Sequence, residues 1–143
     1  IVGVFSLELA RLYNYLYQKS TTNYTILHAL EGYDEVSLTC DFKAFSASGE
    51  RIFSVEELGF EKISATSITG GSTVEQSAEI FRSVLSNKAT AEQQNVVLVD
   101  AALAIQTMQS QLSFADAYYQ AEESLISGKA LASFNRLIQL SEA

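Results

Sequence analysis

Residues 1–28, IVGVFSLELARLYNYLYQKSTTNYTILH, decide the fold. The segment 1–5 is a short apolar run, which is typical of a buried strand of a parallel sheet. Ser6 suits a helix N-cap, and apolar side chains then recur at helical spacing to about Lys19. Residues 24–28 are rich in β-branched and aromatic side chains, as a second strand should be. This strand, helix and strand form a βαβ unit, which predicts a parallel pair with a right-handed crossover.

The residues after this unit have the pattern of antiparallel structure. Short extended segments fill residues 36–54, and the sequence SGE between two of them predicts a β-hairpin. Ser54 and Glu57 then have the spacing of a capping box, which predicts a one-turn helix.

The second half of the chain is predicted to be helical. Capping and helix-ending residues divide it into about four helices: Ser72 with Glu75, Thr90 with Gln93, Ser113, and Gly128 as a C-cap. The first helix carries one apolar stripe, formed by Val74, Ala78, Phe81 and Leu85. Residues 95–105 are apolar nearly all round, so their helix should be buried. Asp100 lies inside this helix, and it is either a buried carboxylate that needs partners or part of an exposed helix edge.

These elements predict an α/β fold: a partial, mostly parallel sheet with a short antiparallel hairpin, followed by about four C-terminal helices. The 143 residues, 48% of them hydrophobic, suffice for one domain with a core. Because a buried parallel strand needs neighbours on both sides, we expect the chain to begin in the middle of a domain.

Composition excludes several classes of partner and site. The net charge of −8, with only 9 Lys and Arg residues, argues against binding to nucleic acid or to an anionic membrane. No stretch approaches the roughly 20 apolar residues that span a bilayer, and the single Cys40 cannot form an internal disulfide, so we expect a cytoplasmic protein. His28 is the only histidine, which rules out a histidine metal cluster or a Ser-His-Asp triad and favours a structural role at a strand end.

Two adjacent acids, Asp34 and Glu35, lie in the segment HALEGYDEVSLTCD at 28–41. They follow the carboxyl end of the strand 24–28, which is the edge of an α/β sheet where ligands usually bind. Two carboxylates on a loop can share a hard cation, and Mg²⁺ typically takes one or two of them plus substrate phosphates and waters. The alternative is a pair of solvated loop acids.

Several segments resemble, in order, the C-terminal part of anthranilate phosphoribosyltransferase, and together they cover essentially residues 1–143: VGVFSLELARLYNYL, YTILHALEGYDEVSLTCDFK, EELGF, GGSTVEQSAEIFRSVL, NVVLVDAALAI and ESLISGKALASFNRLI. The resemblance implies the nucleoside-phosphorylase-like phosphoribosyltransferase fold. It also implies transfer of the phosphoribosyl group from phosphoribosyl pyrophosphate to anthranilate, with release of pyrophosphate, in tryptophan biosynthesis. Asp34 and Glu35 would bind the Mg²⁺ that holds the pyrophosphate.

The same resemblance implies that other parts of the enzyme lie outside this chain. The glycine-rich substrate loop, the anthranilate-contacting residues and the N-terminal helices of the family's homodimer all precede the matched region, so we expect this fragment alone to be inactive. TGGS at 69–72 is interpreted as a turn into a helix, not as a phosphate loop. Ala29 and Cys40 stand where the family commonly has glycine, which would cost about 1 kcal/mol wherever the backbone needs a positive φ.

Two alternatives stay open. One is a relative of pyrimidine nucleoside phosphorylase, which shares the architecture, although GYDE at 32–35 argues against it. The other is a noncatalytic module that kept the fold and lost the chemistry. The upstream reading frame separates the transferase from the noncatalytic module: a helical bundle followed by a strand and a Gly-Thr-Gly-Gly-Asp-like loop would favour the transferase, and a start codon near residue 1 would favour the module.

Overall fold

The first three elements form the βαβ unit that the opening residues predict. The structure is a computed structural model and describes residues 1–141. Strand β1 (Val2–Gly3) pairs in parallel with β2 (Thr25–Ala29), and helix α1 (Leu7–Tyr17) connects them. The side chain of Ser6 accepts a hydrogen bond from the Leu9 N–H and caps α1, as predicted.

The sheet contains the predicted hairpin and is mixed. Strands β3 (Phe42–Ser46) and β4 (Gly49–Phe53) are antiparallel neighbours, and β3 also runs antiparallel to β2, so the strand order is β1-β2-β3-β4. The α/β class is confirmed, but within residues 1–141 parallel pairing is confined to β1 and β2. The reason is the short return from β2 to β3, which contains no crossover helix.

Strand β1 is shorter and more open than predicted. In the described part of the chain it pairs with β2 alone and forms one edge of the sheet. Val4 just beyond it is buried, but Ile1 and Phe5 are 51% and 69% exposed. The expected second neighbour of this strand is therefore absent among residues 1–141.

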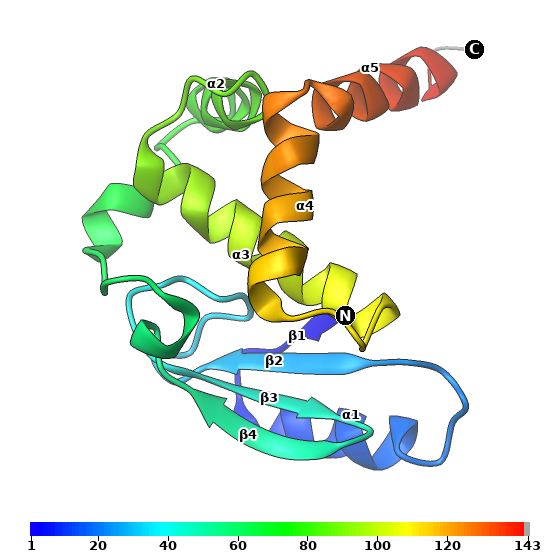
Figure 1. The fold of residues 1–143 in the computed structure, drawn as a ribbon. Helices are drawn as coiled ribbons and strands as arrows, with labels where there is room; N and C mark the ends of the chain where they lie inside the picture. Colours follow the sequence, from blue (N-terminus) through cyan, green and yellow to red (C-terminus); the bar gives the residue numbers. More distant parts are fainter. Residues whose placement is uncertain (142–143) are drawn as a thin grey trace.

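Helices cover both faces of the sheet. On one face α1 packs over Ile26 and Phe45, together with Tyr24. On the other face Leu27 and Phe42 meet side chains of helix α3 (Ala91–Met108), and Figure 1 shows α1 and α3 on opposite sides of the strands. Neighbouring strand residues thus enter different buried clusters, as the alternation of side chains along a strand requires.

The remaining elements follow the predicted helical order. They are two short 3₁₀ helices, η1 (Glu56–Leu58) and η2 (Ala65–Ile68), and then α2 (Val74–Leu85), α3, α4 (Phe114–Ile126) and α5 (Lys129–Ser141). Ser54 with Glu57 and Thr90 with Gln93 form the predicted reciprocal capping bonds, and Ser113 caps α4. Gly128 has a φ of +77° directly after Ser127, the C-cap of α4, and so ends that helix.

The predicted start of α2 is wrong by one residue. Thr73, not Ser72, is the N-cap, and its hydroxyl accepts the N–H of Gln76. Thr73 and Gln76 also have capping-box spacing, and the Gln76 amide oxygen accepts hydrogen bonds from the N–H and hydroxyl of Ser72. Ser72 is thus hydrogen-bonded to Gln76 but is not the N-cap of the helix.

Burial separates α3 from the outer helices. α3 is buried along Leu98, Val99, Ala102 and Leu103, but the burial predicted for residues 95–105 holds on one side only, because Val97 is 47% exposed. The predicted stripe of α2 is only partly covered in residues 1–141, since Val74 is 81% and Phe81 48% exposed while Ala78 and Leu85 are half-buried. Val84 is the buried residue of this helix. Figure 1 shows α2 and α5 at the end of the molecule away from the strands.

Within the described residues, no helix combines the length and the apolar character that crossing a membrane requires.

Candidate functional site

The acidic pair lies on the loop between β2 and β3, at the carboxyl end of β2. Both Asp34 and Glu35 are exposed and lie in a bend of the chain. At the base of the loop, the Gly32 N–H donates to the Ala29 carbonyl, and the Ala29 N–H donates to Tyr33 at 3.1 Å. The Leu30 N–H donates to the Asp41 carbonyl at 2.9 Å, which extends the β2–β3 pairing into the loop. The two acids are therefore presented from a tied loop, at the edge that the sequence predicts.

Gly3 of β1 lies directly beneath this bend. A Cβ at Gly3 would overlap the backbone carbonyl of Asp34, so only glycine lets the two backbones approach this closely. Sequence reasoning missed this contact. The signal was a glycine inside a very short strand, which often marks close approach of another backbone.

Asp100 of α3 meets the other side of the bend. Its Oδ1 accepts the N–H of Val36, the residue after Glu35, at 3.1 Å. Burial raises the pKa of Asp100 to about 7, against the lowering effect of the Val36 bond, and the charges of Glu35 and Asp34 raise it further. Of the two readings that the sequence left open, the structure favours the carboxylate with a partner, although Asp100 is half-buried and not fully buried.

His28 has the structural role that the sequence favours. It is buried in β2, and its Nδ1 lies 2.9 Å from the Val4 carbonyl oxygen. Because a carbonyl can only accept, Nδ1 carries the proton and donates. This hydrogen bond joins β2 to the residue that follows β1.

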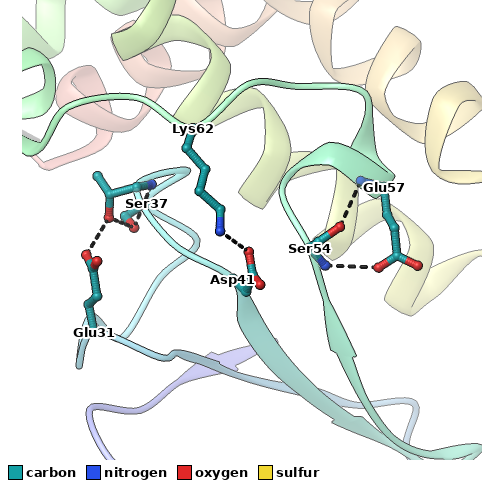
Figure 2. A network of polar contacts seen from close by, with 7 residues as sticks. Glu31, Ser37, Asp41, Ser54, Glu57 and Lys62 are labelled. Carbon is teal, nitrogen blue, oxygen red and sulfur yellow. Dashed lines mark hydrogen bonds and ion pairs between the residues drawn. The ribbon is translucent and has the colours of Figure 1, made fainter.

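The far part of the loop is attached to the segment after η1. The Lys62 ammonium lies 2.7 Å from Asp41, which raises the pKa of the lysine, and the Ile63 N–H donates to the Leu38 carbonyl at 3.0 Å. Closer to the acids, the Thr39 hydroxyl donates to Glu31 at 2.9 Å. Figure 2 shows Glu31, Asp41 and Lys62 gathered around this loop. The Glu31 carboxylate is thus engaged in a local hydrogen bond to Thr39.

Residues 36–40, predicted to be extended, form no strand, and residues 38–40 lie in bends. Their side chains explain why, since Val36 and Leu38 are completely buried in the cluster beneath α3, along with Cys40. Leu38 adopts a φ of +59°, a conformation that costs a non-glycine residue about 1–2 kcal/mol and is held here by burial.

The concern over Ala29 and Cys40 does not apply to this backbone. Neither residue has a positive φ; Ala29 is part of β2 and pairs with Phe42. The positive φ values in this loop belong instead to Gly32 and Leu38.

Asp34 and Glu35 suit a cation that takes most of its ligands from substrate and water and few from the protein. Over residues 1–141 no set of three or more His, Cys, Asp or Glu side chains is placed to hold a metal, and neither Asp34 nor Glu35 forms an ion pair there. Two exposed, unpaired carboxylates match a Mg²⁺ that also takes phosphate oxygens and waters.

The segment TGGS at 69–72 forms a turn into α2. Gly71 has a φ of +83°, and a Cβ there would lie 2.8 Å from Cβ of Gln76. The hydroxyl of Ser77 donates to the Gly70 carbonyl at 2.6 Å. Local side chains thus occupy the polar groups of this turn, in agreement with a helix start.

Comparison with known proteins places the chain among glycosyltransferases. The family model described as glycosyl transferase family, a/b domain, matches residues 1–131. Anthranilate phosphoribosyltransferase of Christiangramia forsetii is 49% identical over 142 residues, and that of Flavobacterium psychrophilum 48% over 141 residues. Each alignment covers 99% of this chain but only 43% and 42% of the relative, so the chain spans less than half of their length.

Solved structures agree in fold. Anthranilate phosphoribosyltransferase from Saccharomyces cerevisiae, in complex with PRPP and Mg, superposes with a TM-score of 0.84 at 23% identity and covers 96% of this chain and 39% of its own. The Thermus thermophilus enzyme gives a TM-score of 0.86 at 22% identity and covers the whole of this chain and 43% of its own. The match of the family model over residues 1–131 shows that the chain belongs to the glycosyl transferase family and carries part of its a/b domain.

Proposed function

We propose that this chain is the C-terminal portion of the α/β domain of an anthranilate phosphoribosyltransferase, a cytoplasmic enzyme of tryptophan biosynthesis. The observation that carries the proposal is the 49% identity to a protein of that name over 142 residues. The reaction would transfer the phosphoribosyl group of phosphoribosyl pyrophosphate to the anthranilate amino group. The yeast structure in complex with PRPP and Mg supports the substrate and the cation for the family.

In this proposal Asp34 and Glu35 hold Mg²⁺ against the pyrophosphate group. The cation would stabilise the negative charge that develops on pyrophosphate as its bond to the ribose carbon breaks. The chain's own contribution is to present two carboxylates from a loop fixed by β1, α3 and the Lys62 segment, so that little reorganisation accompanies binding. Neither carboxylate has to exchange a proton in this role.

The remainder of the proposed enzyme lies in the part of the relatives that this chain does not cover. We place there the glycine-rich substrate loop, the residues that contact anthranilate, and the N-terminal helices of a homodimer. Holding two reactants in position supplies much of the rate of such a catalyst. The 143 residues alone should therefore show no turnover, whereas a complete protein that carries them should.

Phosphoribosyltransfer by a complete protein that carries this sequence tests the proposal. With anthranilate, phosphoribosyl pyrophosphate and Mg²⁺, we expect turnover that falls about 10²-fold or more in Asp34→Asn or Glu35→Gln, since each removes a charge from the developing pyrophosphate. Glu31→Gln is the matched control, because Glu31 is an exposed acid of the same loop that bonds locally to Thr39.

Three results would contradict the proposal. Equal losses in all three variants would mean that loop charge in general, not the acidic pair, matters. Turnover with a pyrimidine nucleoside and phosphate in place of these substrates would favour the phosphorylase reading. Absence of both activities in a complete, folded protein would favour a noncatalytic module.

A further inference from the structure

The backbone that carries the acidic pair is contacted on both sides by elements from distant parts of the chain. Before the pair, the Asp34 carbonyl rests against Gly3 of β1, where no side chain would fit. After the pair, the Val36 N–H donates to Oδ1 of Asp100 on α3, across 64 positions of sequence. The Val36 side chain is completely buried in the same cluster as Val99 of α3. The backbone of Val36 is thus bonded to α3, and its side chain shares a buried cluster with residues of that helix.

We propose that Asp100 is a positioning residue for the cation site: its Oδ1 fixes the Val36 N–H and thereby sets the direction in which Asp34 and Glu35 leave the backbone. The inference rests on the proposed function, because it assigns a role towards the Mg²⁺ that these two residues would hold. Groups that orient metal ligands from outside commonly contribute about 10–100-fold to metal affinity.

The geometry favours this indirect role over direct ligation by Asp100. One of its oxygens is already bonded to the Val36 N–H, and the side chain is half-buried whereas Asp34 and Glu35 are exposed. Within residues 1–141 the three acids do not form a set that could hold a metal together. Removing the acceptor would leave an N–H at a buried residue without a partner, and the bend would have to shift to reach water.

Substitutions at Asp100 can test whether the Val36 N–H needs a hydrogen-bond acceptor there or a negative charge. Asparagine retains an oxygen at the position of Oδ1 and can accept the Val36 N–H, while leucine has similar size and no acceptor. The variants Asp100→Asn and Asp100→Leu therefore separate hydrogen bonding from charge. Asp34→Asn, which alters a proposed ligand, tests the proposed function in the same experiment.

The experiment titrates a complete protein that carries this sequence with Mn²⁺ alone and follows the free ion by electron paramagnetic resonance. We expect Asp100→Asn to bind Mn²⁺ within about threefold of the parent protein because it keeps the acceptor. Asp100→Leu should bind about 10–100-fold more weakly. Asp34→Asn should also bind more weakly, by at least as much.

Distinct results overturn the two ideas. Parent-like binding by Asp100→Leu alongside a loss in Asp34→Asn would overturn the positioning role and leave the proposed function standing. A loss in Asp100→Asn as large as that in Asp100→Leu would overturn it as well, because charge would then be what matters. Parent-like binding by Asp34→Asn would overturn the proposed site, and the role of Asp100 with it.

A second measurement covers the case in which Asp100→Leu does not fold. Hydrogen exchange at the Val36 amide can be followed in the parent protein and in Asp100→Asn, both without added metal. The proposed bond predicts slow exchange at this amide in both proteins. Exchange as fast as that of a solvent-exposed loop amide in the parent protein would show that Asp100 does not hold Val36, and would overturn the inference.

Discussion

The loop between β2 and β3 buries apolar side chains completely, whereas the outer helices α2 and α5 leave nearly all of theirs at least partly exposed. The loop has no regular secondary structure, yet Val36 and Leu38 are completely buried and its backbone is bonded to α3 and to the segment after η1. Helices α2 and α5 are regular, but α2 buries only Val84, and no residue of α5 is buried. In this chain, regularity of the backbone is therefore no measure of how firmly a segment is held.

The difference lies in which partners each region finds within residues 1–141. The loop is surrounded by β1, α3 and the Lys62 segment, each of which supplies a contact. Helix α5 packs mainly on α4, and α2 meets α5 through the edge-on contact of Phe81 with Phe134, whose ring centroids lie 5.0 Å apart. A site that must orient a cation benefits from the first kind of attachment.

The largest expected effect compares Phe42, the first residue of β3 after the loop, with Phe81 of α2. Phe42, at the end of the loop, is completely buried and stacks on Phe53 at 5.3 Å, so Phe42→Ala should lower the free energy of unfolding by about 3–5 kcal/mol. Phe81→Ala on α2 removes the same atoms from a half-exposed position and should cost about 1 kcal/mol. Denaturant unfolding of both variants measures the difference, and equal losses would refute the contrast.

An intermediate effect compares Leu38 and Asn87, the two non-glycine residues of positive φ within residues 1–141. Leu38→Gly relieves the backbone in the loop but empties a buried position, and should still destabilise the protein by roughly 2–4 kcal/mol. Asn87, with a φ of +56° after α2, is exposed, and Asn87→Gly should change stability by a few tenths of a kcal/mol. Thermal unfolding distinguishes them; stabilisation by Leu38→Gly would show that strain outweighs burial at this position.

A smaller effect concerns two glycines. In Gly3→Ala the new Cβ would overlap the Asp34 carbonyl, and shifting the bend should cost about 1–3 kcal/mol. Gly70→Ala is the matched control, because a Cβ there meets nothing within 4 Å. The melting temperature should fall in the first variant only. An unchanged melting temperature in Gly3→Ala would mean that the bend does not rest on β1.

The sequence predicted those features that depend on neighbouring residues. The βαβ unit, the hairpin and the Thr90 capping box follow from patterns a few residues long, and the structure confirms them. The same rules failed where two local patterns competed, as at Ser72 and Thr73, and where burial replaced a strand, as at residues 36–40. Asp34 and Glu35 were singled out by their position after a strand, and their role as cation ligands stays a prediction.

The surroundings of the acidic pair could not be predicted in the same way. Gly3 and Asp100 reach it from far along the chain, and no local pattern specifies which residue of a strand or helix will touch a distant loop. Even so, the sequence raised the question at Asp100, because a carboxylate within an apolar helix needs a partner. Only the packing of α3 on the sheet identified that partner as Val36.

The hydrogen bond from Val36 to Asp100 also bears on the order in which the molecule folds. It closes a loop of 64 residues, and the bond between Thr25 and Thr107 closes one of 82, whereas α1 and the β3–β4 hairpin need only local contacts. Contacts between distant residues form at a larger entropic cost and tend to come later. We therefore expect the direction of Asp34 and Glu35 to be set among the last steps, once α3 has docked on a sheet that is already assembled.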